Sequence, residues 1–91
     1  MLEVAITGGL KEGFTLNIQT TEMNDRRMTH ISAYHFEHDS ATFTLNYTET
    51  DYFLRWFNES FKVINLHRVI EILIEHKNAP WFDAWKEIVA L

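Results

Sequence analysis

The chain has 91 residues, of which 46% are hydrophobic and 14% aromatic, and it contains no cysteine. This composition predicts one folded domain over residues 1–91 and excludes a disordered chain, a disulfide scaffold and a zinc–thiolate site. The formal net charge is −5, and the only two adjacent bases are Arg26 and Arg27. Since proteins that bind nucleic acids or anionic membranes carry basic patches, we expect neither direct nucleic-acid binding nor membrane association.

The chain also lacks the sequence signals of secretion and membrane insertion. Residues Met1–Val4 do not combine a basic region with a long apolar stretch, as a signal peptide would. The longest apolar segment, Val69–Ile74, is interrupted by Glu71 and is far shorter than the roughly 20 residues that span a bilayer. With the absence of cysteine, these features lead us to expect a cytoplasmic protein.

Residues 1–47 have the alternating pattern of β-strands. Apolar residues recur at every second position in Leu2–Ile6 and Phe14–Ile18, with all three glycines between these segments. This pattern predicts a hairpin of two half-buried strands joined by a glycine-rich loop. If Ile6 lies opposite Phe14, all the apolar side chains of the hairpin share one face.

Two more strands are predicted at about Met28–Phe36 and Ala41–Tyr47, after a polar loop over residues 21–27. We expect the four residues Glu37–Ser40 to connect these strands, with Phe36 opposite Ala41. This register places an aromatic and polar set on the inward face of the sheet: His30, Ser32, Tyr34, Phe43, Leu45 and Tyr47.

Residues 48–91 have the pattern of helices. We predict helices over about Glu49–Asn58 and Leu66–Lys77, and a last helix that begins near Pro80. Thr48 and Asn65 are the expected N-caps of the first two. In both of these helices the apolar residues cover about 200° of the circumference, which is more than one sheet can bury. Ser60–Ile64 is either a fifth strand or an irregular link.

Strands that precede helices in the chain indicate the α+β class. We therefore predict an antiparallel meander sheet of four strands, or five if Ser60–Ile64 pairs, with two to three C-terminal helices packed on one face. The sheet would occupy residues 1–47, and the helices would occupy residues 48–91.

No motif in the sequence indicates a metal, a cofactor or a catalytic group. His35 and His38 are three residues apart, so on a continuous strand they would point to opposite faces, and no zinc spacing is present. The glycine-rich loop leads into a strand, whereas phosphate-binding loops lead into a helix. Glu71 and Glu75, one turn apart, are typical of a solvated helix face. We expect no metal, no cofactor and no enzymatic activity.

The most distinctive feature is the surplus of aromatic residues in two helical clusters, residues 52–61 and 81–85. These side chains could build the core of a small domain, or part of them could form a contact surface, since interfaces are rich in Trp, Tyr and Arg. The candidate partner-binding residues are Tyr52, Arg55, Trp56, Phe57, Trp81 and Trp85.

Our leading hypothesis is a non-enzymatic protein-binding module, such as an inhibitor or adaptor of viral or mobile-element type, that binds another protein or itself as a homodimer. One alternative is a small enzyme or ligand-binding domain with a sheet–helix pocket around His30, Tyr34 and Tyr47. Another is an acidic mimic of nucleic acid, which would need several carboxylates gathered on one face.

Overall fold

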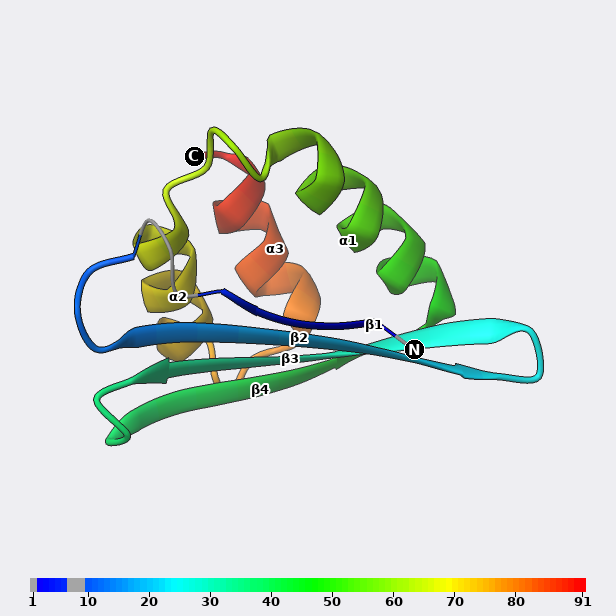
Figure 1. Cartoon of the computed structure of the whole chain (residues 1–91), viewed down its shortest axis with the longest axis horizontal. Helices are drawn as coiled ribbons and strands as arrows, with labels where there is room; N and C mark the ends of the chain where they lie inside the picture. The colour runs from blue at the N-terminus through cyan, green and yellow to red at the C-terminus, as the bar shows by residue number, and fades with distance from the viewer. Residues whose placement is uncertain (1, 7–9) are drawn as a thin grey trace.

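A computed structural model describes the backbone of residues 2–6 and 10–91 and the side chains from Leu10 onward. The α+β class is confirmed: one antiparallel sheet in the order β1-β2-β3-β4 carries all three helices on one face (Figure 1). The elements are β1 (Leu2–Ile6), β2 (Phe14–Met23), β3 (Arg26–His35), β4 (Asp39–Leu45), α1 (Tyr47–Ser60), α2 (Leu66–Glu75) and α3 (Trp81–Val89).

Of the two alternatives predicted for Ser60–Ile64, the structure has the irregular link and not the fifth strand: α1 ends at Ser60, and residues 61–64 form a turn before α2. The backbone N–H groups of Val63 and Ile64 both donate to the carbonyl of Ser60, at 2.9 and 3.1 Å. These donors are used locally and are not available to a sheet ladder.

The β1–β2 register differs from the prediction by two residues, because Ile6 lies opposite Leu16 and not opposite Phe14. A shift of two residues preserves the faces of a strand, so Leu16 and Ile18 are buried as expected. The predicted loop glycines 8 and 9 lie outside the described residues. Gly13 has a φ of +89°, a conformation that favours glycine, and an added Cβ would lie 2.5 Å from the Phe36 ring and displace it.

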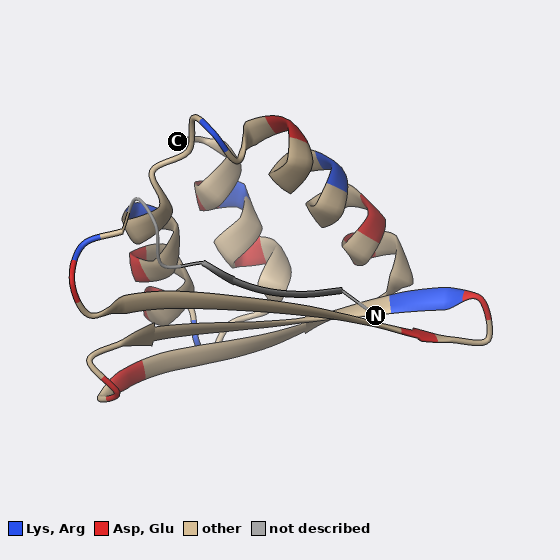
Figure 2. Ribbon diagram, in the orientation of Figure 1, with Lys and Arg blue, Asp and Glu red and all other residues tan. Residues whose placement is uncertain are grey.

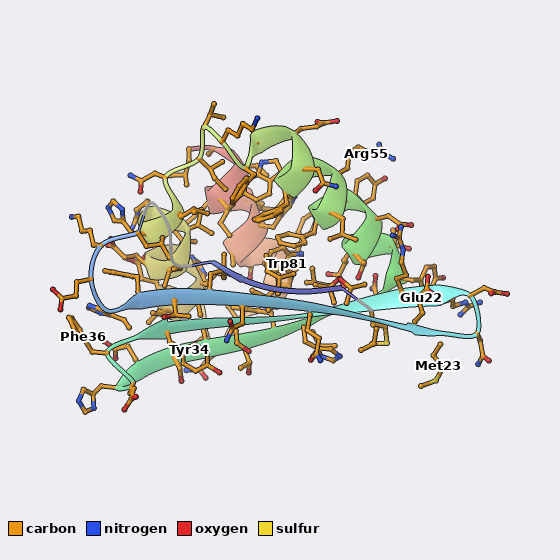
Figure 3. The ribbon with its side chains drawn as sticks, in the orientation of Figure 1. Glu22, Met23, Tyr34, Phe36, Arg55 and Trp81 are labelled. Carbon is orange, nitrogen blue, oxygen red and sulfur yellow. The ribbon has the colours of Figure 1, made fainter. Side chains whose placement is uncertain are left out.

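The predicted β3–β4 register is wrong by an odd number of residues, which turns β3 over. Ile31 lies opposite Phe43, a place that the prediction gave to Tyr34. As a result Thr29, Ile31 and Ala33 face the helices and are buried, and the polar residues of the strand lie on the outer face. Figure 3 shows Tyr34 on the side of the sheet away from the helices.

The cause of this shift is a short turn after His35. His35 pairs with Asp39, so only three residues connect the strands. Phe36 and Glu37 adopt positive φ angles of 52° and 63°, the conformation of a type I′ turn, and the His38 N–H donates to the His35 carbonyl at 3.3 Å. Glycine and asparagine are the usual residues in such turns, so the sequence contains no signal for it.

The core fills the space between the sheet and the helices. Its members include Leu16, Ile18, Ile31 and Leu45 from the sheet, Phe53 from α1, Ile70, Ile72 and Leu73 from α2, and Trp81 from α3. The void between these layers measures only about 10 Å³ and is lined by apolar side chains, which is barely room for one water. The described side chains therefore leave no sheet–helix pocket of ligand size at this place.

The N-cap of α1 is Asn46, two residues before the predicted Thr48. The Asn46 side chain accepts a hydrogen bond from the Glu49 N–H at 2.9 Å, and the Glu49 carboxylate accepts one from the Asn46 N–H at 3.0 Å. This reciprocal capping box starts the helix directly after β4. Asn65 caps α2 as predicted, because its side chain accepts from the Arg68 N–H at 3.3 Å.

We expect Asn46→Ala to lower the free energy of unfolding by about 1 kcal/mol, since an orphan N–H of α1 loses its acceptor. Thr48→Ala, two positions later, should change it by less than about 0.5 kcal/mol. Urea unfolding followed by far-UV circular dichroism measures both. An equal loss in the two variants would contradict the assignment of the cap to Asn46.

Among the described residues, no helix combines the length and the apolar character needed to cross a bilayer.

Candidate functional site: an aromatic groove between α1 and α3

Helices α1 and α3 stand over the same sheet and are joined by aromatic rings. Over their full lengths, which the structure describes, no α-carbon of one helix comes within 8 Å of the other. The ring centroids of Trp56 and Trp85 are 5.0 Å apart, and Phe53 lies 5.8 Å from Trp81 and 6.3 Å from Trp85. Large rings thus hold the two helices apart and fill part of the space between them.

Between the N-terminal halves of α1 and α3 lies a hollow of about 360 Å³ that opens to solvent. Phe53 and Trp81 form its floor and are only 5% and 8% exposed. The more exposed rings Tyr52, Phe82 and Trp85 also line the hollow, together with the side chain of Glu49. We call this hollow the α1–α3 groove and define it by these residues: Glu49, Tyr52, Phe53, Trp81, Phe82 and Trp85.

Tyr52 and Phe82 are the most exposed members of the groove, at 63% and 58%. Among the described residues no aromatic ring packs against either of them. The ammonium of Lys86, one turn along α3, lies 5.0 Å from the centroid of Phe82. Two large rings are therefore exposed to solvent at the mouth of a groove whose floor residues are buried.

The six candidate residues from the sequence divide between the core, the groove and the outer surface. Trp81 is buried against Phe43 at 5.8 Å and belongs mainly to the core. Tyr52 and Trp85 line the groove, and Trp56 is half-buried beside it, against Trp85. Arg55 is exposed on α1 and points away from the sheet (Figure 3).

Phe57, the remaining candidate, does not line the groove. Its ring stacks on Phe53 at 5.8 Å and lies 5.2 Å from Phe61, near the end of α1. Two members of the groove, Glu49 and Phe82, were absent from the candidate set. Phe82 could have been found, because Phe82, Trp85 and Val89 recur at the i, i+3, i+7 spacing of one helix face. Glu49 carried no signal beyond its place in the first turn.

Charged residues of both signs occur along α1 and α3 (Figure 2). Glu49 is the only charged side chain among the described residues that line the groove. The capping box uses its Oε1 atom, which fixes the carboxylate at the start of α1. Asp83 occupies the corresponding first turn of α3. The groove is thus an apolar hollow with a carboxylate in its wall.

The alternative pocket around His30, Tyr34 and Tyr47 is not formed. His30 and Tyr34 lie on the outer face of the sheet, where the His30 Nδ1 is 3.2 Å from the Thr44 hydroxyl. Tyr47 begins α1, with the Arg26 guanidinium 4.8 Å above its ring. Ser32 shares the outer face with His30, because it pairs with Asn17 and Thr42.

His35 and the paired acids of α2 each contact another side chain of the fold. His35 stacks on Phe14 at 4.3 Å, and within the part of the chain that the structure describes no three potential ligands converge on a metal position. Glu71 and Glu75 lie 3.6 and 3.2 Å from the Arg68 guanidinium, so both acids of this helix face pair with a base.

Comparisons of the chain with protein-family models, curated proteins and solved structures found no match.

Proposed function

We propose that the protein is a cytoplasmic, non-enzymatic protein-binding module, of the inhibitor or adaptor kind, and that it uses the α1–α3 groove. The observation that carries this proposal is the exposure of Tyr52 and Phe82 at the mouth of a groove with an aromatic floor. The binding energy of protein interfaces is concentrated in a few aromatic side chains beside preformed pockets. The α1–α3 groove has both features, exposed aromatic side chains and a preformed hollow.

The energetic reason is the apolar surface that the fold leaves in water. Full burial of one large apolar side chain contributes about 1.5–3 kcal/mol, and Tyr52 and Phe82 retain more than half of their surface exposed. The rings beneath them prevent α1 and α3 from closing over this surface. A partner that covers the groove would gain this free energy without any rearrangement of the core.

The test compares the proteins captured from a cell lysate by three immobilised forms of the chain. These forms are the wild type, the groove variant Tyr52→Ser/Phe82→Ser, and the control variant Met23→Ser. Met23 is 75% exposed, lies at the end of β2 in the β2–β3 hairpin (Figure 3), and is not among the residues that line the groove. We expect the wild type and the control to capture the same protein and the groove variant to lose it. Equal capture by all three forms would refute the proposal.

Light scattering on the same forms tests whether the partner is a second copy of the chain. A homodimer that uses the groove should become a monomer in the groove variant and stay a dimer in Met23→Ser. Far-UV circular dichroism should give matching spectra for all three forms, because neither Tyr52 nor Phe82 is part of the buried core.

A further inference from the structure

We propose that the α1–α3 groove binds an arginine side chain of the partner protein, with the guanidinium between the aromatic rings and the Glu49 carboxylate. This inference rests on the proposed function and names the chemistry of the group that the groove takes. Its basis is the composition of the wall: five aromatic rings, one carboxylate and, among the described residues that line it, no base.

An aromatic ring attracts a cation over its face, because the ring carries partial negative charge there. Tyr52 and Phe82 have no ring partner among the described residues, and Trp85 lines the same hollow. The flat guanidinium suits such a site better than an ammonium, since it stacks on rings and is more weakly hydrated. The hollow of about 360 Å³ is large enough for one such side chain.

The chain already places one cation against a ring of the groove wall. The Lys86 ammonium lies 5.0 Å from the Phe82 ring centroid, within the range of a cation–π contact. Lys86 is outside the lining of the groove and reaches Phe82 from the next turn of α3. The position shows that a positive charge is compatible with this ring, and it also makes Lys86 a competitor of an incoming arginine.

The helix N-termini near the groove oppose a cation, because each carries about half a positive charge. Both helices offset this effect with a carboxylate in the first turn, Glu49 in α1 and Asp83 in α3. The net charge of −5 adds a long-range attraction for a basic partner. Glu49 is the only one of these charged side chains that lines the groove, so it is the residue that would contact a bound cation most directly.

The experiment titrates the wild type with N-acetyl-arginine amide and with N-acetyl-citrulline amide, which has nearly the same shape but no charge. Shifts of the Trp85 indole signal in NMR spectra report binding at the groove. We expect arginine to bind about fivefold more tightly than citrulline, and Lys86→Gln to raise the affinity for arginine about twofold.

Two variants with the same change in net charge separate the site from the general charge. Glu49→Gln keeps the capping box, because glutamine also serves at this position, and it should remove most of the preference for arginine. Glu59→Gln, on the exposed last part of α1, should leave the preference unchanged. An equal loss in both variants would overturn the inference, because the attraction would then belong to the whole surface.

Failure of this inference and failure of the proposed function give different results. Equal shifts with arginine and citrulline, or no shift with either, would overturn the arginine site and leave partner capture by the groove untouched. Preferential binding of arginine, with capture unaffected in Tyr52→Ser/Phe82→Ser, would overturn the assignment of the arginine to a protein partner and refute the proposed function.

Discussion

Replacing Trp81 with alanine is expected to lower the free energy of unfolding by about 3–5 kcal/mol, which is a large part of the stability of a small domain. The indole is 8% exposed and packs against three other rings. The ring centroids are 5.5 Å apart for Trp85 and 5.8 Å apart for both Phe43 and Phe53. Its removal leaves a cavity beneath the groove that rigid neighbours cannot fill. Urea unfolding followed by far-UV circular dichroism measures the loss.

The matched control is Tyr52→Ala, which removes a ring of similar size from the mouth of the same groove. Tyr52 is 63% exposed, so its removal should cost less than about 1 kcal/mol. Equal destabilisation by the two substitutions would contradict the division of the groove into a structural floor and an available rim.

Ile31→Asp should prevent folding or cost more than about 4 kcal/mol, because it places an unpaired carboxylate in the centre of the sheet–helix core. Ile31 is 1% exposed and lies between Ile18 and Phe43 in the neighbouring strands. The control, Ser32→Asp, changes the next residue on the outer face and should cost about 1 kcal/mol or less.

This pair of substitutions is a direct test of the β3 register. In the register that the sequence alone favoured, Ser32 faces the helices and Ile31 faces solvent. A tolerated Ile31→Asp together with a destabilising Ser32→Asp would therefore contradict the structure. The measurement is again the midpoint of urea unfolding, with the wild type as reference.

The contrast between β2 and β3 explains how far the sequence could predict the fold. In β2 the apolar residues Leu16 and Ile18 alternate with Asn17 and Gln19, so the buried face is unambiguous. In β3 polar residues occur on both faces, and the choice depended on the turn that follows. Because Phe36 and Glu37 enter positive φ without a glycine or asparagine, the predicted turn was one residue too long and the strand was inverted.

The helices were predicted more accurately because their signals are local. Asn65 is followed by a continuous apolar pattern, and α2 begins where this cap predicts. Prediction of the candidate site was less complete for a physical reason. Helical periodicity identifies the apolar side of α3, but it cannot tell that Trp81 points into the core while Phe82 stays at the groove. That division depends on the placement of α1, which no local pattern contains.

The proposed contact surface for a partner protein is the rim of the α1–α3 groove. It is tested most directly by photo-crosslinking, with p-benzoylphenylalanine in place of Tyr52 and, as a control, in place of Tyr34 on the outer face of the sheet. Both substitutions replace a tyrosine by a photoreactive ring. After irradiation in a lysate of the cells that express the protein, we predict a discrete adduct from position 52 and none from position 34. An adduct from position 34 alone, or none from either, would contradict the account.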